Sequence, residues 1–179
     1  IINWFDNNEP LSGFGKLILG ESFIANGNMN KGIIRQASHQ TFIEKLLLFI
    51  RGNLFIPDAR KTWVKPSVKF LRKYINANDI DTIITTGPPH SMHLIGLQLH
   101  QQLKLTWLAD FRDPWTTIGY HSKLQLLRSA RLKHKRLEKK VLQSADQIIV
   151  TSPTTKLEFE SITKRPIAVI TNGYDVDSD

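Results

Sequence analysis

Short apolar runs alternate with helical patterns through the second half of the chain. The runs at 80–85, 105–109, 147–151 and 167–170 each predict a buried strand. Apolar residues at helical spacing predict helices between them, at 89–103, 122–143 and 153–162. Strands separated by helices form βαβ units, so the expected fold is α/β with a parallel sheet flanked by helices.

The first half of the chain is less regular. Residues 1–5 predict a short strand, and the Asn- and Gly-rich stretch 6–32 predicts a long loop that we expect to be mobile. Two helices are expected, at 40–51 and 66–76, with Asp58 capping a short helical turn between them. We interpret residues 1–171 as one domain and residues 172–179, which begin at an Asn-Gly turn, as the start of a linker.

Composition narrows the class of protein. With 41% hydrophobic and 9% aromatic residues among 179, the chain is expected to be globular. It contains no cysteine, which excludes disulfides, thiolate catalysis and Cys-based zinc sites and fits a cytoplasmic protein. The formal net charge of +8 indicates an anionic partner, namely nucleic acid, a phosphorylated substrate or an acidic membrane.

Most of this charge lies in the predicted helix at 122–143. Eight basic residues face one acid there, Glu138, which gives +7 of the +8. The basic residues are Lys123, Arg128, Arg131, Lys133, Lys135, Arg136, Lys139 and Lys140. Four apolar residues are expected to attach the helix to the sheet, namely Leu124, Leu127, Leu137 and Val141.

Three interpretations of this basic helix stay open. The first is a solvated surface helix. The second is a strip that lies on anionic lipid, where each basic residue contributes about 1 kcal/mol. In the lipid interpretation, the contacts are expected from Arg128, Arg131, Lys135 and Lys139. Nucleic acid is the least favoured partner, because the helix lacks interleaved aromatic residues.

Turn-forming and polar residues follow the first long strand, in the order Gly87-Pro88-Pro89-His90-Ser91. The glycine allows a sharp turn, and the prolines favour the start of a helix whose N–H groups and dipole attract an anion. His90 is expected to point from the first helical turn into the crevice beyond the strand ends. The alternative is a tight strand-to-helix turn in which His90 only caps neighbouring carbonyls. His93 and His100 share this helix, but their spacing favours structural roles and no metal site.

Three charged residues follow the second strand, in the stretch Asp110-Phe111-Arg112-Asp113-Pro114-Trp115. The Arg112 guanidinium suits phosphate or carboxylate, and either aspartate could hydrogen-bond a sugar hydroxyl. Because ligands of open α/β sheets bind beyond the carboxyl ends of the strands, we expect this loop and the 87–91 loop to line one wall of a cleft. The alternative is an internal Asp110–Arg112 pair that closes the loop.

Together these stretches resemble the N-terminal domain of glycosyltransferase family 4-like proteins. The resemblance is carried by residues 86–91, 109–115, 137–142 with 145–146, and 171–175, and 56–60 with Trp63 also fit. It runs from roughly residue 51 to residue 175.

The resemblance implies a GT-B architecture, in which two Rossmann-like domains face a cleft. The N-terminal domain would bind the acceptor and the C-terminal domain the nucleotide-sugar donor, with metal-independent transfer and no cofactor. Gly87, Ser91, Asp110 and Arg112 would then bind substrate. Asp113 would orient or deprotonate the acceptor hydroxyl, and Arg112 or His90 would stabilise phosphate charge.

The expected function is therefore that of the acceptor-binding part of a hexosyltransferase-like enzyme of polysaccharide biosynthesis. It would transfer a sugar from a nucleotide sugar to a lipid-linked or polysaccharide acceptor, in the cytoplasm or at the inner face of the membrane. Since the donor domain is missing from the pattern, the chain is expected to be a fragment without activity of its own, and an uncovered sheet edge would favour a homodimer. The alternative is a non-catalytic α/β module that binds a phosphorylated or polyanionic partner.

Overall fold

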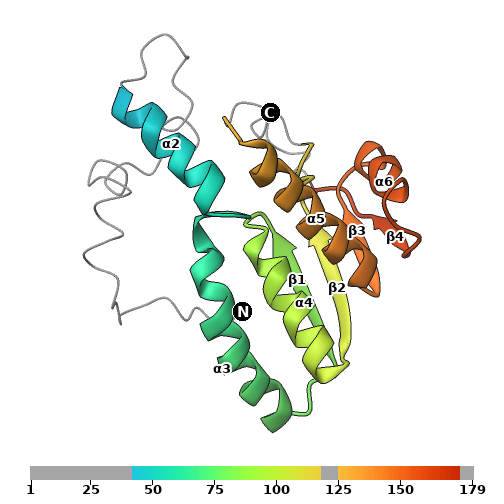
Figure 1. The fold of residues 1–179 in the computed structure, drawn as a ribbon. Helices are drawn as coiled ribbons and strands as arrows, with labels where there is room; N and C mark the ends of the chain where they lie inside the picture. Colours follow the sequence, from blue (N-terminus) through green and yellow to red (C-terminus); the bar gives the residue numbers. More distant parts are fainter. Residues whose placement is uncertain (1–41, 118–124, 174–179) are drawn as a thin grey trace, which may run out of the picture. The chain divides into compact units, whose positions relative to one another are not determined.

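The computed structural model describes residues 42–117 and 125–173 (Figure 1). The chain divides after Leu47 into two units, and all the described strands lie in the second, residues 48–179. Helix α2 (Phe42–Leu54) crosses this division. The strand expected at 1–5 and the loop expected at 6–32 lie outside the described residues.

Four parallel strands form the sheet. They are β1 (Thr82–Gly87), β2 (Thr106–Phe111), β3 (Gln147–Val150) and β4 (Ile167–Val169), in the spatial order β1-β2-β3-β4. All three pairings are parallel. The predicted α/β fold with a parallel sheet is thereby confirmed, and the sheet with its helices has a Rossmann-like arrangement.

The connecting segments are helical. They are the 3-10 helix η3 (Ala59–Trp63) and the helices α3 (Val64–Ala77), α4 (Ser91–Leu103), α5 (Arg128–Ser144) and α6 (Pro153–Glu160). Asp58 caps η3 as predicted, since its side chain accepts from the Arg60 N–H. Helix α5 begins later than predicted, because Leu127 is extended and donates its N–H to Asn53 Oδ1 at 2.7 Å.

Helices α4, α5 and α6 cover the same face of the sheet (Figure 1). Phe111 of β2 shows this directly, because its ring stacks on His93 of α4 at 4.2 Å and meets Phe159 of α6 edge-on at 5.0 Å. Each crossover connects neighbouring parallel strands in the same direction, so the right-handed rule places every helix on one side. Helix α3 packs alongside α4.

The core lies between these helices and the sheet. Its fully buried side chains include Trp107, Phe111, Val141, Leu142, Ile148 and Val150. Each large apolar side chain buried in this way contributes about 1.5–3 kcal/mol. Gly96 lets α4 approach closely, because a Cβ there would lie 2.4 Å from Trp107 Nε1.

The other face of the sheet has no helix over it within the described residues. Thr82, Ile84 and Thr86 of β1 are exposed, and Ile84 retains 62% of its accessible surface. The expectation that β1 is a buried strand is therefore wrong for this face. β1 is also an edge strand of the described sheet, so a homodimer through this edge stays a prediction.

Candidate functional site

The ends of β1 and β2 lie side by side, as predicted. Gly87 is in register with Phe111, and the Arg112 N–H donates to the Gly87 carbonyl at 3.0 Å. The Arg112 carbonyl in turn accepts from the Thr151 hydroxyl at 2.9 Å. The backbone of Arg112 is thus fixed from both neighbouring strand ends.

The charged side chains after β2 point in different directions. Arg112 and Asp113 are exposed, whereas Asp110 is half-buried and lies opposite Thr86 in the register, on the face without helices. No ion pair joins Asp110 to Arg112, although both are described, so the alternative of an internal pair is wrong. The Arg112 guanidinium and the Asp113 carboxylate are accessible to a ligand.

His90 does not project into the crevice, contrary to the prediction. Its side chain is only 3% exposed, and its ring stacks on the Trp115 indole at 4.8 Å with the planes 2° apart. Phe111 and His93 lie 6.0 and 5.9 Å away. The aromatic residues around this turn therefore pack against His90 instead of leaving it at a surface.

An anion does occupy the N-terminus of α4, but it belongs to the chain. Asp58 Oδ2 accepts the Ser91 N–H at 2.8 Å, and Oδ1 accepts the Ser91 hydroxyl at 2.9 Å. The helix dipole and free N–H groups attract a carboxylate there, as expected of a helix N-terminus. Ser91, predicted to bind substrate, is 1% exposed and bonded to Asp58. Sequence reasoning missed this pair because 33 residues separate its members.

The absence of a side chain at Gly87 leaves space for the imidazole of His93. A Cβ on Gly87 would lie 2.6 Å from His93 Nε2, so a larger residue would displace the imidazole. His93 is fully buried, and its Nδ1 lies 2.9 Å from the Thr85 hydroxyl, which also accepts from Trp107 Nε1 at 2.9 Å. Burial, together with the nearby His90, lowers the pKa of His93 well below 6.5, so the ring is neutral.

His100 also has structural partners. Its Nδ1 lies 2.7 Å from the Leu105 carbonyl and 3.5 Å from the Asp146 carboxylate. Across the described residues, no three His, Asp or Glu side chains are grouped closely enough to hold a metal ion. The hydrogen-bond partners of His93 and His100, the Thr85 hydroxyl and the Leu105 carbonyl, give both histidines structural roles.

Helix α5 has two distinct faces. Its seven Lys and Arg residues are all exposed, including the predicted contacts Arg128, Arg131, Lys135 and Lys139. Leu127, which we expected to attach the helix, is 52% exposed, and Glu138, the one acid among the basic residues, is 3% exposed. The inward face is instead formed by Ala130, His134, Glu138, Val141 and Leu142.

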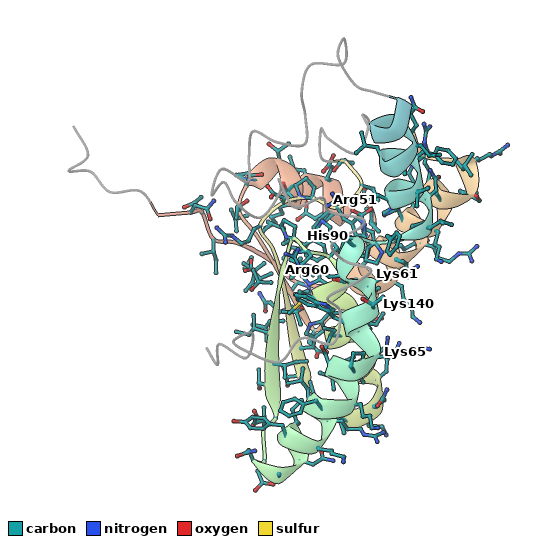
Figure 2. The ribbon with its side chains drawn as sticks, turned by 90° about the vertical axis from the view of Figure 1, so that its left-hand side faces the viewer. Arg51, Arg60, Lys61, Lys65, His90 and Lys140 are labelled. Atoms are coloured by element: carbon teal, nitrogen blue, oxygen red, sulfur yellow. The ribbon has the colours of Figure 1, made fainter. Side chains whose placement is uncertain are left out.

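Helix α3 extends the basic surface, which the sequence analysis did not anticipate. Its exposed Lys65, Lys69, Arg72 and Lys73 are accompanied by no acid, and α4 carries no Lys, Arg, Asp or Glu. We call α3 and α5 the basic helices, since together they expose eleven basic side chains and no acidic one. Figure 2 shows Lys65 of α3 and Lys140 of α5 projecting away from the sheet. None of the described helices combines the length and the apolar character needed to cross a membrane.

Two hollows in the described surface lie at the opposite end of the sheet from Arg112 and Asp113. They have volumes of about 500 and 350 Å³ and share Gln143 and Arg165. The first is formed where α5 and α6 end, and the second where α4 and α5 end. Neither includes a residue predicted to bind substrate.

Comparison with known proteins assigns the family. The model of Glycosyltransferase Family 4 matches residues 34–178, which is most of the chain and includes both strand-end loops and the basic helices. No significant match was found to a curated protein or to a solved structure. The chain therefore belongs to glycosyltransferase family 4.

Proposed function

We propose that this chain binds the acceptor in a glycosyltransferase of GT-B architecture. The sugar would come from a nucleotide-sugar donor held mainly by a second domain, and the acceptor would be lipid-linked or a polysaccharide. The observation that carries the proposal is the loop after β2, where Arg112 and Asp113 are exposed on a backbone fixed by Gly87 and Thr151. Fixed loops of this kind at strand carboxyl ends are common ligand sites in α/β folds.

In this proposal the exposed and the buried residues have different roles. Asp113 orients or deprotonates the acceptor hydroxyl, Arg112 neutralises phosphate charge, and Asp110 contributes a hydrogen bond to substrate. Gly87 allows His93 to pack beneath the turn. His90 and Ser91 act through packing, because both are buried.

Sugar transfer tests the proposal. Because the chain is expected to be inactive on its own, every transfer assay uses the chain joined to the proposed donor domain. This protein is incubated with labelled UDP- and GDP-sugars and with lipid extract or polysaccharide as acceptor, and incorporated label is measured. We expect transfer from a nucleotide sugar and a loss of about 100-fold in Asp113→Asn, because a general base contributes at least that much. The matched control is Asp79→Asn, an exposed acid in a turn with φ of 49°, which asparagine readily adopts. Wild-type rates in Asp113→Asn would contradict the assigned role.

We further propose that the basic helices bring the protein to anionic lipid at the inner face of the membrane. The supporting observation is the eleven exposed basic side chains without an exposed acid. Sedimentation with phosphatidylcholine vesicles, with and without phosphatidylserine, measures this. Replacing Arg131, Lys135 and Lys139 with Glu should weaken binding to the anionic vesicles about 100-fold or more, since each basic residue contributes about 1 kcal/mol. Equal binding to neutral vesicles would exclude the electrostatic interaction.

The same surface favours a second candidate function, a non-catalytic module for a phosphorylated or polyanionic partner. The two functions separate in one experiment with inorganic polyphosphate as the probe. If the module is correct, the triple Glu variant loses polyphosphate binding and the wild type shows no sugar transfer. If the glycosyltransferase is correct, transfer to a soluble acceptor survives in that variant.

A further inference from the structure

Two polar residues lie on the buried face of α5, one helical turn apart. His134 and Glu138 are each 3% exposed, and both face the segment that follows Arg112 and Asp113. Buried polar groups are costly unless they are hydrogen-bonded, so their partners indicate what they do. Family membership and the proposed acceptor site leave both residues without a role.

Glu138 binds one residue through both carboxylate oxygens. Its Oε1 accepts the Thr116 N–H at 3.0 Å, and its Oε2 accepts the Thr116 hydroxyl at 2.6 Å. Burial raises the pKa of Glu138, while the hydrogen bonds from Thr116 and from the Trp115 backbone oppose that shift. Hydrogen bonds to a carboxylate are stronger than neutral ones, so the position of Thr116 is firmly set.

His134 fixes the position of Trp115, the residue before Thr116. The Trp115 indole Nε1–H donates to His134 Nδ1 at 3.1 Å, and the two rings meet edge-on. The face of the same indole stacks on His90. Helix α5 therefore determines where Trp115 and Thr116 lie, and through Trp115 it supports the turn at the start of α4.

The other end of this loop is fixed independently. Arg112 is bonded through its N–H to Gly87 and through its carbonyl to Thr151. The exposed side chains of Arg112 and Asp113 thus lie on a loop whose two ends are both fixed, by strands on one side and by α5 on the other. Such preorganisation is what a site needs to present reacting groups in one geometry.

We propose that Glu138 is a positioning residue for sugar transfer, which sets the geometry of Arg112 and Asp113 through its two hydrogen bonds to Thr116. The inference rests on the proposed function of this loop. Glu158 offers a contrast, because its Oε2 accepts the Thr117 hydroxyl at 2.9 Å but both residues are exposed. A surface hydrogen bond of this kind has water as an alternative partner, so it should matter little.

The first experiment needs no substrate. Amide hydrogen exchange is measured by NMR in the wild type, Glu138→Ala and Glu158→Ala. In Glu138→Ala we expect exchange at Thr116 and also at Arg112 to accelerate about 10-fold or more, because local opening follows the loss of the buried bonds. Glu158→Ala should leave both amides unchanged. Acceleration at Thr116 alone would show that Glu138 does not act on Arg112 and would overturn the proposal.

The second experiment measures transfer. We expect kcat to fall about 100-fold in Glu138→Ala, as for a small misplacement of reacting groups, while the KM for the nucleotide sugar changes less than about 3-fold. Glu138→Gln should recover most of kcat, because its oxygen still accepts the Thr116 N–H. An equal loss in Glu158→Ala, or no recovery in Glu138→Gln, would overturn the proposal.

Two outcomes need a further measurement, namely a Glu138→Ala variant that does not fold and a wild type that transfers no sugar. If Glu138→Ala does not fold, Thr116→Val removes only the hydroxyl bond and should show a smaller loss of kcat in the same direction. Unchanged kcat in a folded Thr116→Val variant would then overturn the proposal. If the wild type transfers no sugar, the proposed function fails, and the exchange experiment still decides whether Glu138 sets the loop.

Discussion

The two faces of the sheet differ in how they bury and hydrogen-bond the same type of residue. Thr85 and Thr86 are neighbours on β1, yet Thr85 is 7% exposed beneath α4 and Thr86 is exposed on the side without a described helix. The Thr85 hydroxyl accepts from Trp107 Nε1 and is bonded to His93. The Thr86 hydroxyl faces solvent, which can satisfy it.

The difference shows on which face of the sheet the hydrogen bonds of polar groups contribute to stability. On the covered face, the Thr85 hydroxyl is the partner of both the Trp107 indole N–H and Nδ1 of His93, and removing it leaves both nitrogens unsatisfied away from water. On the open face, water replaces any lost partner. The exposed Arg112 and Asp113 belong to neither arrangement, because hydrogen bonds to Gly87 and Thr151 fix the Arg112 backbone while both side chains stay accessible.

The largest expected effect on the free energy of unfolding comes from removing the Thr85 hydroxyl on the covered face. Thr85→Val keeps the shape of the side chain but leaves Trp107 Nε1 without its acceptor and His93 Nδ1 without its partner. We expect a loss of about 3 kcal/mol of unfolding free energy, measured by urea denaturation, since each buried unsatisfied group costs about 1–3 kcal/mol.

Thr86→Val is the matched control on the same strand. It makes the same chemical change on the open face, so we expect a difference within about 0.5 kcal/mol of the wild type. Equal losses in the two variants would mean that the hydrogen bonds of Thr85 are not what distinguishes the faces.

A smaller effect is expected from pH. The folded-state pKa of His93 is lowered, so below about pH 6.5 the unfolded state binds the proton first, and stability is lost as the pH falls. The loss can approach about 1.4 kcal/mol per pH unit for one proton. Denaturation of the wild type and of His93→Gln between neutral and mildly acidic pH measures it, and the variant should show a flatter profile.

Glu138 has to be separated from this effect, because its sign is opposite. Its folded-state pKa is raised, so the folded state retains the proton more strongly and stability falls as the pH rises above the usual range of a glutamate. Repeating the comparison in a Glu138→Gln background isolates His93. An unchanged pH slope in His93→Gln would contradict the assignment.

The smallest effect is expected at Ile84, the most exposed apolar residue of β1. Because its side chain retains 62% of its surface, Ile84→Asn should change the unfolding free energy by no more than about 0.5 kcal/mol. Thermal unfolding is a sufficient measurement. A loss of several kcal/mol would show that this face is covered after all, for example by a second copy of the chain.

The sequence predicted the elements well and the orientation of side chains poorly. All four strands overlap the predicted runs, and the helices from α3 onward begin within a few residues of expectation, except α5. Local periodicity carries that information. His90 was expected in the crevice and Ser91 in a substrate site, but both are buried, because their partners Trp115 and Asp58 lie far away in the chain. The burial of Glu138 against Thr116, 22 residues away, was not predicted at all.

The sequence by itself determined the α/β class, the adjacency of the two strand-end loops and the basic character of α5. Each of these follows from short-range pattern and from the rule that parallel strands end at the same edge. Only the tertiary structure decided which face of β1 is covered. The residues that alternate along β1 to one face and to the other include threonine and isoleucine in both cases, so their pattern does not distinguish the faces. The tertiary structure alone also placed Asp58 at the start of α4 and Glu138 behind the Arg112–Asp113 loop, because the cost of burying a polar group depends on neighbours that folding brings together.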